Sequence, residues 1–291
     1  MLYGGRGSDE LMGGEGTDIL NGGRGADLLD GGAGDRDAAD YIDARSGVTA
    51  DLSSGMGSRG EAAGDVYVDI EYLYGSNHDD ILIGDDGVNR LQGRDGDDQL
   101  FGGAGNDILR GDEGADHLDG GEGDRDAADY RWSESGVTVN LHDNYGAGGE
   151  AEGDTFNSIE YVYGSDHNDM ITGSDAVNRL TGGEGDDMLS GMGGNDYLLG
   201  EAGDDTLIGG AGDDVFVFSG TSGDDIISDF EAGAGRTDRA WLKSNSFSDF
   251  DDVKAAMTET DGGVLLDLGV RGSIFFEGLT ADEFHEDDFI I

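Results

Sequence analysis

The chain has 291 residues and a formal net charge of −50, from 66 Asp and Glu against 16 Lys and Arg, and it contains no cysteine and no proline. Such dense negative charge opposes compaction unless cations neutralise it. Nucleic acid and anionic membranes, which carry the same sign of charge, are therefore poor partners, and multivalent cations are good ones. Without cysteine there are no disulfides or thiolate metal sites, and no apolar run approaches the ~18 residues of a membrane span.

The first residues, MLYGGRGSDELM, start inside a repeated pattern. They lack the charged leader and apolar segment of a Sec-type signal peptide. Leu2 and Tyr3 fit the end of a nine-residue unit whose beginning is missing. We therefore expect the sequence to be a piece of a longer protein.

The nine-residue unit has two glycines, a third glycine at position 4, an acid at position 6 and a large apolar residue at position 8. It starts seventeen times, at residues 4, 13, 22, 31, 75, 84, 93, 102, 111, 120, 164, 173, 182, 191, 200, 209 and 220. The units form three arrays, 1–39, 75–128 and 164–228. Position 6 carries the candidate metal ligands Asp9, Asp18, Asp27, Asp80, Asn89, Asp98, Asp107, Asp116, Asp169, Asn178, Asp187, Asp196, Asp205, Asp214 and Asp225.

Two inserts, 40–74 and 129–163, separate the arrays, and residues 31–74 match 120–163 at 25 of 44 positions. Alternation of apolar and polar residues, as in SGVTADL and SGVTVNL, is typical of half-buried strands. We expect the inserts to be longer coils of the same architecture, with a small side domain as the alternative. Their acids Asp40, Asp65 and Glu71, with the counterparts Asp129, Asp154 and Glu160, are either additional ligands or solvated and turn-capping groups.

The last segment, 229–291, breaks the nine-residue period. SDFDDVKAAM predicts a helix with Phe250, Val253 and Met257 on one face and Ser248 as N-cap. GGVLLDLG and GSIFFEG predict a hairpin, and TADE at 280–283 fits a capping box that opens one more helical turn. Because an open-ended stack of coils exposes its last coil, we expect this segment to act as a cap.

Nine residues suit a short strand and a tight turn, with the position-8 side chain pointing inward. Two units then make one coil, and coils must stack to bury their leucines. Stacking brings position 6 of one unit next to position 6 of the unit two further on. Such close carboxylates repel unless a cation lies between them. Carboxylates and turn carbonyls suit Ca²⁺ better than Mg²⁺, and pairing the units predicts about ten ions.

The pattern resembles the RTX, or haemolysin-type, calcium-binding nonapeptide G-G-x-G-x-D-x-U-x. The resemblance covers residues 1–228 and implies a right-handed parallel β-roll whose ions lie between successive turns, held by position-6 aspartates and turn carbonyls. Asn89 and Asn178 should give weaker sites. Arg36 and Arg125, which occupy position 6 in two units, cannot be ligands. His78, His167 and Ala176 replace the third glycine.

Residues 229–291 are similar to the C-terminal region of RTX proteins exported by type I secretion. The resemblance therefore implies a calcium-responsive folding and export module of a larger secreted, extracellular bacterial protein, which uses the type I secretion machinery. We divide the chain into a roll, 1–228, and a C-terminal cap and secretion region, 229–291, and expect a monomer.

Catalytic motifs such as H-E-x-x-H and G-x-S-x-G are missing, and the five histidines are scattered, so we predict no enzyme activity in this chain. Two alternatives stay open. The chain is a segment of an extracellular adhesin or surface-layer protein, or it is the accessory roll of an enzyme whose catalytic domain lies upstream.

Overall fold

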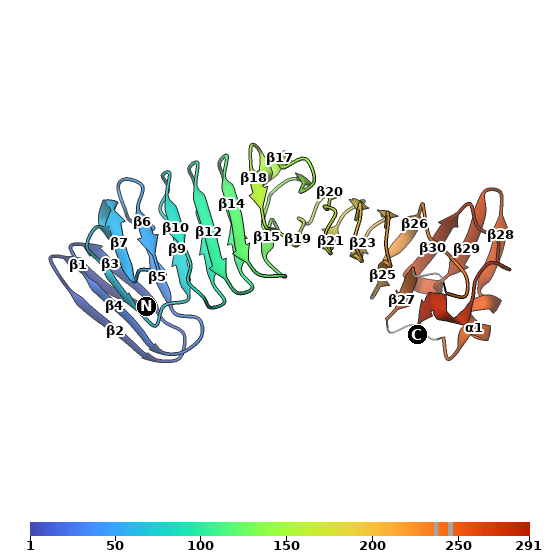
Figure 1. Cartoon of the computed structure of the whole chain (residues 1–291), viewed down its shortest axis with the longest axis horizontal. Coiled ribbons are helices and arrows are strands. Elements are labelled where there is room, and N and C mark those ends of the chain that lie inside the picture. The colour runs from blue at the N-terminus through green and yellow to red at the C-terminus, as the bar shows by residue number, and fades with distance from the viewer. Residues whose placement is uncertain (236–237, 244–246) are drawn as a thin grey trace. The chain divides into compact units, whose positions relative to one another are not determined.

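The computed structural model describes residues 1–235, 238–243 and 247–291. They form two compact units, one of residues 1–130 and 144–159, the other of residues 131–143 and 160–291. In each unit short strands stack side by side (Figure 1), and nearly all the stacked pairs are parallel. The expected all-β parallel β-roll is confirmed. No helix in the described ranges is long and apolar enough to cross a membrane.

Unit 1 is built from two sheets. The first has the order β1 (Leu2–Arg6), β3 (Ile19–Arg24), β5 (Ala38–Asp40), β9 (Tyr72–Tyr74), β11 (Arg90–Gln92), β13 (Ile108–Arg110) and β15 (Ala127–Asp129). The second has the order β18 (Thr155–Asn157), β14 (His117–Glu122), β12 (Gln99–Ala104), β10 (Ile81–Ile83), β6 (Thr49–Asp51), β7 (Met56–Arg59), β8 (Val66–Val68), β4 (Leu28–Ala33) and β2 (Glu10–Glu15). Consecutive nine-residue units thus alternate between sheets, and two make one coil.

The apolar position-8 residues stack in register along each sheet. Leu82 pairs with Leu100, and Leu100 pairs with Leu118, so the register advances by two nine-residue units per coil. All three side chains are fully buried. Successive side chains of a strand point to opposite faces, so each short strand buries its middle residue in the core. This packing sets the position of each turn relative to the turns of the coils before and after it.

The first insert continues both sheets of unit 1. Its strand β9 pairs with β5 and β11, β8 pairs with β4, and β6 pairs with β10. Strand β7 lies between β6 and β8 and is antiparallel to both. The insert therefore places three strands where an ordinary coil places one. Unit 1 also contains β17 (Tyr145–Ala147) and the short 3-10 helices η1 (Gly60–Ala62) and η2 (Gly149–Ala151).

Unit 2 repeats the two-sheet arrangement. One sheet has the order β19 (Tyr161–Tyr163), β21 (Arg179–Glu184), β23 (Tyr197–Ala202), β25 (Val215–Phe218), β27 (Arg239–Leu242) and β31 (Phe289–Ile290). The other has the order β16 (Thr138–Asn140), β20 (Met170–Thr172), β22 (Met188–Ser190), β24 (Thr206–Ile208), β26 (Gly223–Ile227), β30 (Gly272–Glu277), β29 (Gly263–Asp267) and β28 (Met257–Thr260). The unit also contains α1 (Phe250–Ala255), η3 (Gly269–Arg271) and η4 (Glu286–Asp288).

The C-terminal segment joins the last coil through both sheets. Strand β30 pairs with β26 in parallel, and β27 pairs with β25 in parallel, while β31 adds to the far side of β27. Inside, Phe216 of the last coil lies 5.8 Å from Phe230 between ring centroids, and Phe230 lies 5.0 Å from Phe276. Burial of these rings removes apolar surface of the last coil from water.

Of the elements expected in the C-terminal segment, the hairpin is present as predicted and the helix only in part. The hairpin is present as β29 and β30, which pair antiparallel. Helix α1 is present but shorter than predicted, because Met257 enters β28 and pairs with Leu266. Its N-cap is Asp249, not Ser248: the Asp249 carboxylate accepts from the Asp252 N–H at 3.1 Å. A carboxylate at this position also interacts favourably with the helix dipole.

The predicted helical turn at TADE is wrong. Glu283 does accept from the Thr280 N–H at 2.7 Å, as one half of a capping box would require. The residues nevertheless form only a turn. The next residue, Phe284, packs 4.9 Å from Phe276 between ring centroids, which directs the chain into the aromatic cluster instead of into a helix.

Candidate metal centre

The position-6 side chains form rows that run along each roll. In unit 1 the Asp80 N–H donates to Oδ1 of Asp98 at 2.7 Å, and the Asp98 N–H donates to Oδ1 of Asp116 at 2.8 Å. In unit 2 the Asp187 N–H donates to Oδ1 of Asp205 at 2.9 Å. The same contact joins Asp9 to Asp27, Asn89 to Asp107, Asp169 to Asp187, Asn178 to Asp196, Asp196 to Asp214 and Asp205 to Asp225. The stacking predicted from the period is therefore present.

The second oxygen of many row carboxylates is buried without a hydrogen-bond donor. Within the described residues this applies to Oδ2 of Asp9, Asp27, Asp37, Asp98, Asp107, Asp116, Asp187, Asp196, Asp205 and Asp214. A buried polar atom left without a partner costs ~1–3 kcal/mol, and more when it is charged. These oxygens are the expected position of a bound cation.

The position-1 glycines leave room for these oxygens. A Cβ on Gly102 would lie 2.5 Å from Oδ2 of Asp107 and 2.5 Å from the carbonyl oxygen of Gly120 in the next coil. Any larger residue would therefore clash with both atoms. Glycine lets a carboxylate oxygen and a carbonyl oxygen of successive coils face the same space.

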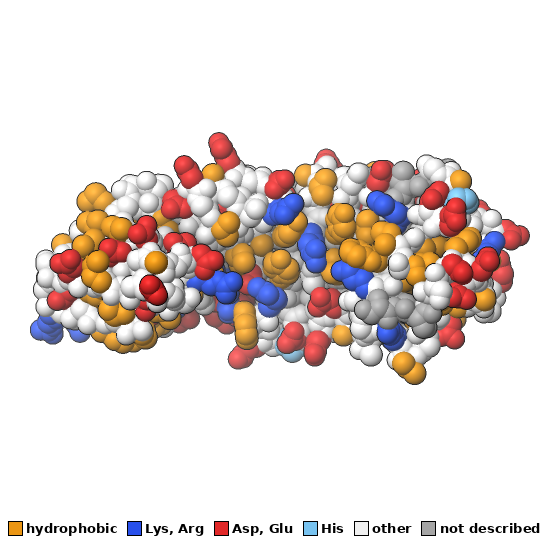
Figure 2. Space-filling model, turned by 90° about the horizontal axis from the view of Figure 1, so that it is seen from below, with side chains coloured by type: hydrophobic (Ala, Val, Ile, Leu, Met, Phe, Trp, Pro, Cys, Tyr) orange, Lys and Arg blue, Asp and Glu red, His pale blue; other side chains and the backbone are white. Residues whose placement is uncertain are grey.

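The rows hold carboxyl groups that are shielded from water. Acidic side chains are spread over the face drawn in Figure 2, yet Asp98 and Asp116 are each only 1% exposed. Burial raises the pKa of Asp98 to about 8; the Asp80 N–H opposes this rise and the Asp116 carboxylate adds to it. Burial likewise raises the pKa of Asp187 to about 8. A bound cation would remove this penalty, because it stabilises the ionised form.

The available donors suit a hard cation. Within the described ranges, no three His, Asp or Glu side chains lie close enough together to hold a metal by themselves. A site would therefore combine row carboxylates with turn carbonyls, which is an all-oxygen set. Calcium accepts six to eight oxygens in flexible geometry, whereas Mg²⁺ requires a stricter octahedron. The residues present fit calcium.

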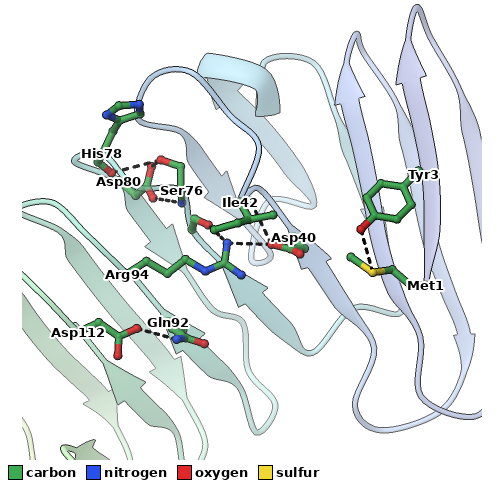
Figure 3. A network of polar contacts seen from close by, with 11 residues as sticks. Met1, Tyr3, Asp40, Ile42, Ser76, His78, Asp80, Gln92, Arg94 and Asp112 are labelled. Atoms are coloured by element: carbon green, nitrogen blue, oxygen red, sulfur yellow. Dashed lines mark hydrogen bonds and ion pairs between the residues drawn. The ribbon is translucent and has the colours of Figure 1, made fainter. Parts of the chain in front are cut away.

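Four candidate residues already use their side-chain oxygens within the protein. The Ser76 N–H donates to Oδ2 of Asp80 at 2.5 Å (Figure 3), and the Ser165 N–H donates to Oδ2 of Asp169 at 2.6 Å. The same kind of contact reaches Oδ1 of Asn89 from Asp85 and Oδ1 of Asn178 from Ser174.

The two asparagines are satisfied at both ends of their amides. Nδ2 of Asn89 donates to the carbonyl of Glu71 at 3.1 Å, and Nδ2 of Asn178 donates to the carbonyl of Glu160 at 3.2 Å. A carboxylate has no hydrogen to donate at these points. Asparagine therefore fits these two positions better than aspartate.

Three members of the rows do not lie at position 6 of a nine-residue unit, so the sequence pattern did not identify them. The Asp18 N–H donates to Oδ1 of Asp37, and the Asp107 N–H donates to Oδ1 of Asp126, each at 2.7 Å. Both acids follow the arginines that occupy position 6, so the spacing is 19 residues instead of 18. In the sequence, the second aspartate of GDRDAADY, which is Asp37 in one copy and Asp126 in the other, could have indicated these two ligands. The third such residue is Asp238, which continues the row of Asn178, Asp196 and Asp214 by accepting from the Asp214 N–H at 3.1 Å.

The insert acids also have partners in the protein. Asp40 accepts from the Arg94 guanidinium at 2.9 Å (Figure 3), and Asp129 lies 3.6 Å from the guanidinium of Arg90. Glu71 accepts from the Asp37 N–H at 2.9 Å. Asp65 and Asp154 extend two of the rows and accept from buried tyrosine hydroxyls, as described below. The inserts thus neutralise or hydrogen-bond their acids with protein groups.

Comparison with known families gives one match. The model of the RTX calcium-binding nonapeptide repeat matches residues 3–37, 74–109, 92–125, 163–198, 181–216 and 190–227, which together make up just over half of the chain. No curated protein matches.

Solved structures with similar folds include two bacterial proteins. The crystal structure of extracellular lipase LipA from Serratia marcescens has 21% sequence identity and a TM-score of 0.34, and it aligns over 76% of this chain. This chain spans only 39% of the lipase. The solution structure of the AlgE6R3 subunit from the Azotobacter vinelandii mannuronan C5-epimerase has 28% identity and a TM-score of 0.36, covering 44% of this chain and 80% of that one.

Proposed function

We propose, because the chain belongs to the family of RTX calcium-binding nonapeptide repeat proteins, that it is a module which folds when it meets extracellular calcium. RTX repeats bind calcium. The further step is that binding and folding are coupled in this chain. The observation that carries it is the row of buried, donor-free Oδ2 atoms in a chain of net charge −50.

The coupling has a physical basis. The two carboxylates that would share an ion belong to different coils and come together only after the strands have stacked. Without a cation the folded chain must bury carboxylates whose pKa is raised, as at Asp98 and Asp187. The unfolded chain keeps the same groups in water. Because these groups assemble into a site only in the folded state, the free energy of metal binding contributes to the free energy of folding.

The proposal includes secretion. Calcium sites of extracellular modules typically have dissociation constants of ~10⁻⁴–10⁻³ M, so the chain stays unfolded at cytosolic calcium and able to pass through a type I exporter. Residues 229–291 are proposed to cap the last coil and to carry the export signal. Their pairing with β25 and β26 of the last coil and the contact of Phe216 with Phe230 support the capping role.

Circular dichroism of the chain in EDTA, then in millimolar CaCl₂ and separately in millimolar MgCl₂, tests the proposal. We expect a disordered spectrum in EDTA and in MgCl₂ and a strand-rich spectrum in CaCl₂. A strand-rich spectrum in EDTA at pH 7 would rule out the coupling.

A further inference from the structure

Two rows of unit 1 end at the insert aspartates Asp65 and Asp154. Asp65 and Asp154 enter these rows as ordinary members: Oδ1 of Asp65 accepts from the Asp27 N–H at 2.9 Å, and Oδ1 of Asp154 accepts from the Asp116 N–H at 2.8 Å. Both aspartates are at most 1% exposed. On this side they match the row members that leave Oδ2 without a donor.

Their second oxygens are different. Oδ2 of Asp154 accepts from the hydroxyl of Tyr130 at 2.6 Å, and Oδ2 of Asp65 accepts from the hydroxyl of Tyr41 at 2.9 Å. Tyr41 is 3% exposed and Tyr130 is 1% exposed, so water does not compete for these contacts. A protein hydroxyl therefore lies where the other row members present a bare oxygen.

The arrangement is built twice, at the same spacing of 24 residues between tyrosine and aspartate. The surroundings differ: Tyr41 also contacts the Tyr67 hydroxyl at 2.6 Å, whereas Tyr130 has Phe156 at the equivalent position, 6.5 Å away between ring centroids. The pair of tyrosine and aspartate is thus retained while its neighbour changes. What the two inserts share is the hydroxyl on the carboxylate.

The turns before these aspartates also lack the cradle of an ordinary unit. A Cβ on Gly57 would lie 2.1 Å from the carbonyl oxygen of Ala62 and 2.7 Å from the hydroxyl of Tyr67, and one on Gly146 would lie 2.4 Å from the carbonyl oxygen of Ala151. Neither has an Oδ2 atom among its nearest neighbours. A phenol satisfies a carboxylate with a single charge-assisted hydrogen bond. A calcium ion needs six or more oxygens, whereas Oδ2 of these aspartates faces the hydroxyl of a buried tyrosine.

We propose that Tyr41 and Tyr130 terminate two of the calcium rows of unit 1, each placing a buried hydroxyl where the next cation would bind. This inference rests on the proposed function, in which the rows hold calcium. The two inserts then set the length of these two rows, because no ion can bridge across Oδ2 of Asp65 or Asp154. Calcium binding is divided into separate blocks, and the chain crosses an insert without a metal ion at these oxygens.

Crystals of the calcium-bound protein, measured at a wavelength where calcium scatters anomalously, test this directly. We expect peaks beside Oδ2 of Asp98 and Asp116 and none within about 2.6 Å of Oδ2 of Asp65 or Asp154. Peaks at the former with a further peak at Asp154 would overturn this inference alone. If no peak lies beside Asp98 and Asp116, the proposed function fails and this inference fails with it.

A pair of variants tests the same point in solution. Tyr130→Phe keeps the ring and removes the hydroxyl; at saturating calcium its Tm should fall by about 2–8 °C, since a buried carboxylate loses its donor. Tyr197→Phe, at a residue that is 40% exposed on β23, is the matched control and should leave Tm unchanged. Equal Tm values for Tyr130→Phe and wild type would contradict the role of the hydroxyl. If Tyr130→Phe does not fold, the wild-type crystals still decide.

Discussion

Replacement of Asp98 by asparagine should destabilise the fold in calcium and stabilise it without calcium. Asp98 is buried, its Oδ2 has no donor, and burial raises its pKa to about 8. In calcium, Asp98→Asn exchanges a charged ligand for a neutral one, and we expect a loss of about 1.5–3 kcal/mol, the size of a charge-assisted interaction. This corresponds to calcium affinity about 10–150-fold weaker at that site.

In EDTA the same substitution should increase the stability of the fold. Asparagine resembles the neutral carboxyl that the raised pKa favours, and it removes the repulsion from Asp116 that contributes to that rise. The calcium-free fold of Asp98→Asn should therefore be more stable than that of the wild type. Urea titration in CaCl₂ measures the first effect, and the gain of strand content in EDTA as pH is lowered measures the second, both by circular dichroism.

The neighbouring Asp97 provides the control. Its carboxylate is exposed, and Oδ1 accepts from the Ala115 N–H at 3.1 Å. Asp97→Asn removes the same charge from the chain without touching the buried row. We expect little change in calcium midpoint or stability. If both variants shift the midpoint equally, the effect comes from net charge and the reasoning about the buried rows is refuted.

Three further predictions follow from the same structure. Deleting 229–291 should raise the calcium midpoint for folding several-fold, since Phe216 would lose its contact with Phe230, whereas deleting 1–39 should do much less; equal midpoints would deny the segment a capping role. In EDTA, strand content should increase as pH falls from 8 to 5. The pKa of Asp98 and Asp187 in the folded state is about 8, above the ordinary 3.8, so the folded chain binds extra protons in this range and loses that stability as pH rises. A pH-independent spectrum would contradict this. Isothermal titration should detect about ten calcium ions and only weak competition by Mg²⁺, and three or fewer ions would exclude the stacked-row arrangement.

The sequence predicted the fold and the rows because both follow from one period. A strand, a turn and an inward leucine repeat every nine residues, and alternation between two sheets then stacks position 6 every 18 residues. The contacts from Asp80 to Asp98 and from Asp98 to Asp116 have that spacing. Repetition made the prediction robust, since an error in one unit leaves its neighbours in place.

Sequence reasoning was least accurate where the period breaks. One additional residue shifts the row from Arg36 to Asp37, and only the strand register reveals that the chain compensates. The contact of Tyr130 with Asp154 joins residues 24 apart across an insert, which no local pattern encodes. At the C-terminus, Asp249 outcompetes Ser248 as N-cap, because two adjacent cap formers differ only in which one reaches the N–H of Asp252.

The central claim is that calcium binding and folding are one event. A calcium titration of the full chain in which bound calcium, by equilibrium dialysis, and strand content, by circular dichroism, are read from the same samples tests it most directly. We predict that both rise together, with coincident midpoints in the range of ~10⁻⁴–10⁻³ M. A strand signal already complete before calcium binds, or calcium bound without any gain of strand, would contradict the account.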